Sequence, residues 1–84
     1  MTDYEPVDCG IYACYELAIM RRRRLRLTWV DESGLTRIDT VRPRDLETRA
    51  GEEFLLIEDS DGKRVRIRLD RITRSSEMPP GGDR

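Results

Sequence analysis

The stretch Arg64-Val65-Arg66-Ile67-Arg68-Leu69 decides the fold class, because charged and apolar side chains alternate along it. Successive side chains of a β-strand point to opposite faces, so this two-residue period predicts a strand with one buried face. The turn signal Ser60-Asp61-Gly62 precedes it, and the apolar run Phe54-Leu55-Leu56-Ile57 lies before that turn. We therefore expect a hairpin, in which the continuous apolar run forms a strand buried on both faces.

A second hairpin is predicted nearer the start of the chain. Leu25, Leu27 and Trp29 alternate with polar residues, so we expect Trp29 to point into the core. Residues 31–34 form a turn signal and residues 35–41 supply the return strand, which Pro43 should end because proline cannot donate to a strand ladder.

The two hairpins are expected to be joined by a polar, turn-like connection over residues 43–53, with Leu46 as its one apolar anchor. After the last predicted strand, Ile72 breaks the alternation of Val65, Ile67 and Leu69. We therefore expect a bend or bulge near Asp70 and Arg71.

Before the first hairpin the spacing changes to that of a helix. Pro6 favours an extended start, and the carboxylate of Asp8 is placed to cap a helix that begins at Cys9. Apolar residues then recur at three- and four-residue spacing, which predicts an amphipathic helix to about Met20 with the buried face Ile11, Cys14, Tyr15, Ala18 and Ile19.

One helix followed by four or five short strands predicts an α+β, mainly β domain. A small, strongly bent antiparallel sheet hides its edges by closing into a β-barrel, and the helix can cover one open end. The expected domain spans residues 1–74, and residues 75–84 (Ser-Ser-Glu-Met-Pro-Pro-Gly-Gly-Asp-Arg) are expected to form a disordered tail.

The composition separates the charges along the chain. Charged residues make up 39% of the 84 residues, yet the net charge is -1, so no overall attraction to nucleic acid is expected. Asp3, Glu5, Asp8 and Glu16 are the only charges in residues 1–20, and residues 21–24 are all arginine. No apolar run is long enough to span a membrane and no apolar leader is recognised, so we expect a cytoplasmic protein.

Residue types that carry chemistry are scarce. The chain has no histidine, and Cys9 and Cys14 lack the further ligands of a zinc site. Asp59 and Asp61 flank a hairpin turn, where carboxylates ordinarily serve as turn formers in water. We therefore expect a protein that is not an enzyme and uses no metal and no cofactor.

Two kinds of binding surface remain open. Arginines form outward rows on two predicted strands, and these would share one RNA-binding surface if the strands were neighbours; they are Arg24 and Arg26 on one strand and Arg64, Arg66 and Arg68 on the other. A solvated face neutralised by Asp39 and Glu58 is the other interpretation, because no aromatic platform for bases is exposed. The second surface is a protein-binding one, in which Tyr4, Tyr12 and Tyr15 stand among the acids of the first segment.

Several stretches also carry a family likeness. The chain opens with Tyr4-Glu5-Pro6-Val7-Asp8-Cys9, followed by Tyr12 and by Glu16-Leu17-Ala18. Later come, in order, Arg44-Asp45-Leu46, Glu53-Phe54-Leu55-Leu56-Ile57-Glu58 and Ile67-Arg68-Leu69-Asp70-Arg71-Ile72-Thr73. In these stretches, across residues 4–74, the chain resembles the Rof family of Rho-binding antiterminators.

The resemblance implies an Sm-like small antiparallel β-barrel with an N-terminal helix. It also implies that the protein binds the transcription termination factor Rho at its primary RNA-binding domain and blocks RNA loading. By matching position, the contact residues would be Tyr12 and Glu16 on the helix and Arg49 in the loop between the central strands, with Asp8 adding negative charge.

The chain departs from the family pattern in two places. Gly10, Ile11 and Ala13 stand where the family tends to be acidic, and the run Arg21–Arg24 is atypical. We expect a monomer that binds Rho. The alternatives are a small Sm-like protein that binds single-stranded RNA through its arginines, and an adaptor for a different protein partner.

Overall fold

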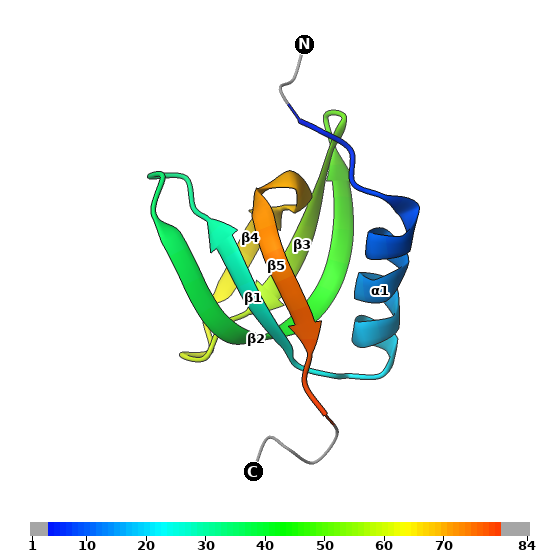
Figure 1. Ribbon diagram of the computed structural model, residues 1–84, viewed down its shortest axis with the longest axis vertical. Coiled ribbons are helices and arrows are strands. Elements are labelled where there is room, and N and C mark those ends of the chain that lie inside the picture. The colour runs from blue at the N-terminus through cyan, green and yellow to red at the C-terminus, as the bar shows by residue number, and fades with distance from the viewer. Residues whose placement is uncertain (1–3, 80–84) are drawn as a thin grey trace.

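The computed structural model describes residues 4–79 and consists of one helix and one antiparallel sheet (Figure 1). In chain order the elements are α1 (Cys9–Met20), β1 (Leu25–Val30), β2 (Thr36–Arg49), β3 (Glu52–Glu58), β4 (Arg64–Arg68), the 3-10 turn η1 (Leu69–Arg71) and β5 (Ile72–Glu77). The strand order is β4-β3-β2-β1-β5, and all paired neighbours are antiparallel. The predicted mainly β, α+β class is confirmed. The ladder is open, because β4 and β5 form its two edges.

β2 is the long strand that bends the sheet. Its residues 36–41 pair with β1 and its residues 42–49 pair with β3, so the strand belongs to both halves. The pairing with β3 slips between Pro43 and Asp45, which leaves Arg44 as the extra residue of a β-bulge. The prediction that Pro43 ends the strand is wrong. Its missing N–H is tolerated because the ladder is already interrupted at the bulge.

The expected turn-like connection over residues 43–53 is also wrong for most of its length. β2 continues to Arg49, which pairs with Glu52, so the connection is the two-residue turn Ala50–Gly51. Both turn residues have positive φ, 52° for Ala50 and 80° for Gly51, as a type I′ hairpin turn requires. The bent sheet therefore ends in a tight hairpin on which β2 and β3 run side by side.

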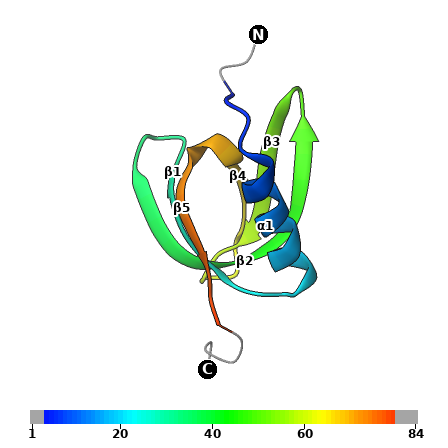
Figure 2. The same cartoon turned by 45° about the vertical axis from the view of Figure 1, so that its right-hand side comes forward.

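The core lies inside the curl of the sheet, and alternation on the strands fills it. Leu27 of β1 and Leu55 of β3 are both 0% exposed, and Trp29 is buried as predicted. In β3 only Leu55 and Ile57 are fully buried, whereas Phe54 and Leu56 are half-buried on the outer face. The prediction that this strand is buried on both faces is therefore wrong, because α1 packs on the sheet from one side only, as Figure 2 shows.

The helix begins as predicted, with the carboxylate of Asp8 accepting a hydrogen bond from the Gly10 N–H at 2.7 Å. Its buried face is centred on Tyr15 and Ala18, with Tyr12 and Ile19 packed beside them. Cys14 and Ile11 are exposed, so their predicted place in the buried face is wrong. The helix is rotated so that the aromatic rings of Tyr12 and Tyr15, rather than the smaller Cys14, fill the space against the sheet.

The predicted irregularity near Asp70 is the 3-10 turn η1, which redirects the chain from β4 into β5. β5 pairs with β1 as far as Glu77, and the Met78 N–H donates to the Arg24 carbonyl at 2.9 Å. The folded domain thus continues past the expected boundary at residue 74. Residues 75–79 of the expected tail are described and their first three lie in β5, whereas residues 80–84 lie outside the described residues.

Candidate functional site

Tyr12 on α1 interacts electrostatically with carboxylates from three elements. Glu16 follows it by one helical turn, Asp45 lies at the β2 bulge, and Glu53 lies on β3. Burial raises the pKa of the Tyr12 hydroxyl, and the negative charges of Glu53, Glu16 and Asp45 raise it further. These four residues are called the Tyr12 group below. The group places a tyrosine ring among three acids on one side of the molecule.

Tyr4 ties the chain entry to this group. Its hydroxyl donates to Oε1 of Glu53 at 2.8 Å, and its ring lies under the guanidinium of Arg68 at 5.8 Å from the ring centre. Arg68 is held in turn by Asp70, with 2.7 Å between Nε and Oδ1. Asp70 also accepts a hydrogen bond from the Glu5 N–H at 3.1 Å. The segment before α1 is therefore fixed to β3, β4 and η1, and it fixes Glu53 in place.

The Tyr4 contacts predict that the free energy of unfolding falls at alkaline pH. Burial, the hydrogen bond to Glu53 and the charges of Glu53 and Asp70 raise the pKa of the Tyr4 hydroxyl well above its ordinary value. The folded chain thus keeps a proton that the unfolded chain loses above about pH 10, so stability is present below that pH and falls as the pH rises further. The free energy of unfolding, from urea curves followed by Trp29 fluorescence, should decline less steeply in Tyr4→Phe than in wild type. Equal slopes in both proteins would contradict this assignment.

The other two predicted contact residues are not part of the Tyr12 group. Asp8 is exposed and caps α1. Arg49 is exposed at the tip of the β2–β3 hairpin. Because Thr48 pairs with Glu53 and neighbouring side chains on a strand alternate, Arg49 lies on the opposite face of the hairpin from Glu53. The structure thus brings together Tyr12 and Glu16, and leaves Asp8 and Arg49 apart from them.

Sequence reasoning missed Asp45 and Glu53 as site residues. Both lie within the stretch that was expected to be turn-like, where the sequence position of a carboxylate does not predict which way its side chain points. A signal was present for Glu53, which keeps the two-residue period of Leu55 and Ile57 and so belongs on the same inner face of the strand. Asp45 had no such signal, because the bulge at Arg44 shifts its direction.

The arginines of the RNA-binding alternative are divided by the strand order. Arg26 is on β1 and Arg64, Arg66 and Arg68 are on β4, and β2 and β3 lie between these strands, so the rows are not neighbours. Arg24 lies before β1. A shared basic surface required these strands to be neighbours in the sheet, and they are not.

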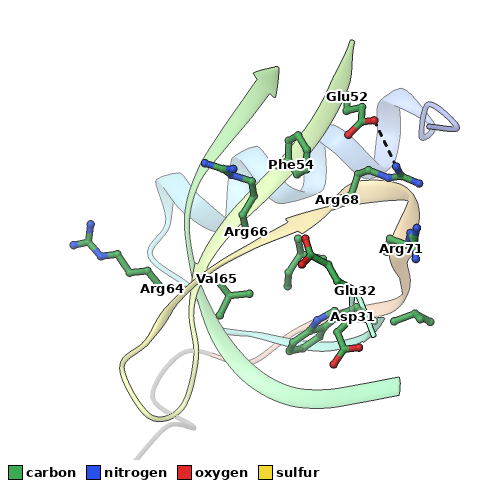
Figure 3. A pocket seen from close by; sticks show the side chains of 12 residues that line it. Asp31, Glu32, Glu52, Phe54, Arg64, Val65, Arg66, Arg68 and Arg71 are labelled. Atoms are coloured by element: carbon green, nitrogen blue, oxygen red, sulfur yellow. Dashed lines mark ion pairs between the residues drawn. The ribbon is translucent and has the colours of Figure 1, made fainter. Parts of the chain in front are cut away.

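The β4 arginines instead line a hollow of about 710 Å³ between β4 and the β1–β2 turn (Figure 3). Arg71 joins them, but Asp31, Glu32 and Glu52 line the same hollow. Arg66 contacts Glu47 at 3.1 Å and covers the ring of Phe54, and Arg68 lies 3.6 Å from Glu52. Figure 3 shows Arg64 extending away from the others. Acids therefore pair with Arg66 and Arg68, but they are Glu47, Glu52 and Asp70 rather than the expected Asp39 and Glu58. Arg64 forms no ion pair within residues 4–79.

Among residues 4–79 no cluster of three histidine, cysteine or acidic side chains could hold a metal ion. Cys9 and Cys14 are free and exposed. Within the same residues no helix is long and apolar enough to cross a membrane.

Comparison with known proteins shows the fold and nothing further. No protein-family model matches the chain, and no curated protein does. A solved structure of proteasome accessory factor B/C (PafBC) of Arthrobacter aurescens is similar, with a TM-score of 0.73 and 19% sequence identity. The likeness covers 90% of this chain and 13% of that one, so this chain corresponds to a small part of PafBC.

Proposed function

We propose that this domain is a Rof-like inhibitor of the transcription termination factor Rho. It binds Rho at the primary RNA-binding domain and keeps RNA from loading, which lowers Rho-dependent termination. The observation that carries the proposal is the Tyr12 group, in which Glu16, Asp45 and Glu53 bring negative charge from three elements to the Tyr12 hydroxyl. The sequence resemblance independently pointed to Tyr12 and Glu16.

The mechanism is charge mimicry and steric blockade, without catalysis or a cofactor. A surface that binds RNA presents cations for phosphates and pockets for bases, so carboxylates around a ring offer it matching groups. Glu16 and Asp45, both exposed, occupy the phosphate positions, and the outer part of the half-buried Tyr12 ring occupies a base pocket.

Asp8 adds charge at the start of α1, and Arg49 contacts an acidic spot beside the main site. Asp45 and Glu53 thereby replace the acids that the helix lacks at Gly10, Ile11 and Ala13.

For the fold itself we propose an Sm-like small β-barrel. The bend of β2 and the curl of the sheet around Leu27 and Leu55 support it. Because β4 and β5 are the two edge strands of the sheet, in this proposal side-chain packing between them, and not backbone hydrogen bonding, closes the barrel. The protein acts as a monomer in the cytoplasm.

The test is a competition titration with purified Rho and a fluorescent pyrimidine-rich RNA at near-physiological salt. The domain should displace the RNA from Rho and leave the anisotropy of free RNA unchanged over the same concentration range. If Rho keeps its RNA at saturating domain, the proposal fails, and a different protein partner becomes the better explanation.

The second candidate function is direct binding of single-stranded RNA, and the hollow lined by Arg64, Arg66, Arg68 and Arg71 favours it. In the same assay it would appear as a rise in the anisotropy of RNA without Rho. Its dependence on salt would have a slope of nearly one log unit for each phosphate contact. The double variant Arg66→Ser and Arg71→Ser, which changes two exposed residues of this hollow, should then remove RNA binding and leave any Rho binding intact.

A further inference from the structure

The run Arg21–Arg24 plays no part in the proposed function, and one of its members is held in an unfavourable backbone conformation. Arg22 has φ 56°, in the left-handed region. It ends α1 in a Schellman arrangement, with its N–H bonded to the Ile19 carbonyl at 3.1 Å and the Arg23 N–H bonded to the Ala18 carbonyl at 2.9 Å. Glycine is the favoured residue at this position, and a larger residue costs about 1 kcal/mol there. An arginine at this position is therefore retained at a cost in stability.

Two further arginines are directed to the same place by the bend in β2. Arg42 and Arg44 flank the buried Pro43, and both are exposed. Arg44 is the extra residue of the bulge, and bulges commonly re-aim a side chain. Both backbone irregularities of this region thus carry an arginine.

Arg22, Arg42 and Arg44 line one hollow of about 360 Å³, together with Ile19 and Pro43, and we call it the Arg22 hollow. Among residues 4–79 no carboxylate lines it. Within residues 4–79 none of the three arginines forms an ion pair, although Glu58 is the cross-strand partner of Arg42. Complementing the helix dipole would explain Arg22 alone. It would not explain two arginines that arrive from β2.

We propose that the Arg22 hollow is a binding site for phosphate groups. Guanidinium groups bind phosphate oxygens through paired hydrogen bonds, and several of them can share one multiply charged anion. Within the described part of the chain the uncharged lining residues are Ile19 and Pro43, which offer no aromatic face for a base, so the hollow recognises the phosphates of its ligand. The site lies at the C-terminal end of α1 and shares no residue with the Tyr12 group.

The test measures binding of inorganic pyrophosphate and of a uridine octanucleotide to the full chain by calorimetry at low ionic strength. Chloride at matched ionic strength is the reference. Arg44→Ser should weaken binding about tenfold or more, as expected for the loss of one charge-assisted contact. Arg74→Ser is the matched control, because Arg74 is exposed on β5, outside this hollow, and should have no effect. The ligand with the lower dissociation constant identifies whether a free or a polymeric phosphate is the source.

Arg22→Gly is the decisive variant, because it should move stability and binding in opposite directions. Glycine relieves the left-handed backbone, so the free energy of unfolding should rise while phosphate binding weakens about tenfold. A merely structural role for Arg22 cannot give that combination. The proposal is overturned if neither phosphate ligand binds above the chloride reference. It is also overturned if the Arg74→Ser control loses as much binding as Arg44→Ser and Arg22→Gly.

Discussion

The Leu27→Ala variant is expected to be largely unfolded at room temperature. Leu27 is 0% exposed, and its strand lies between β2 and β5, so the space left by its side chain cannot be filled by a shift of one neighbour. Such a truncation costs about 3–5 kcal/mol, from lost burial and from the cavity. A domain of this size is commonly stable by about 3–5 kcal/mol in total. Circular dichroism and urea unfolding followed by Trp29 fluorescence would show the loss.

Leu35→Ala is the matched control, since it removes the same atoms from a side chain that is 62% exposed. Exposed substitutions of this kind change stability by about 0.5 kcal/mol or less. A wild-type urea midpoint in Leu27→Ala would mean that the curl of the sheet does not depend on β1 as its centre, and that the core assigned here is wrong.

The parts of the fold that could be predicted from sequence are those fixed by short-range periodicity. Alternation placed the strands that contain Leu27 and Ile67, and the turn residues placed both predicted hairpins. The prediction from Pro43 was wrong because it used only the local rule that proline ends a strand. The bend of β2 creates a bulge at that point, and the bulge needs no backbone N–H there. The same error concealed the second half of β2.

The candidate site shows the same division. Tyr12 and Glu16 were named by the resemblance to the Rof family, and their spacing of four residues on one helix puts them on one face. Asp45 and Glu53 could not be joined to them, because that contact depends on how α1 packs against the β2–β3 hairpin. The prediction that the two arginine rows share one surface failed for a related reason. Each row could be predicted from the alternation within its strand, but that alternation does not give the strand order, which separates β1 from β4.

Reversing the charges beside Tyr12 is expected to remove competition with RNA for Rho. Glu16→Lys and Asp45→Lys each replace an attraction to a basic surface with a repulsion, so each should weaken binding about tenfold, and the double variant should abolish it in the competition titration. The fold should survive, because both residues are exposed. Within residues 4–79 the Asp45 carboxylate accepts a hydrogen bond only from the N–H of the next residue, Leu46, at 2.8 Å, so no long-range hydrogen bond between described residues is lost.

Glu32→Lys separates a local effect from a change in overall charge. It alters the net charge as much as Glu16→Lys does, at an exposed position in the β1–β2 turn outside the Tyr12 group. This control should compete with RNA like wild type. If it loses competition as strongly as Glu16→Lys, long-range steering explains the binding. If the double variant still displaces RNA at the wild-type concentration, the Tyr12 group is not the surface that meets Rho. Screening by salt sharpens the comparison, because steering by the whole domain fades beyond about 8 Å at physiological ionic strength, whereas charges in direct contact keep most of their effect.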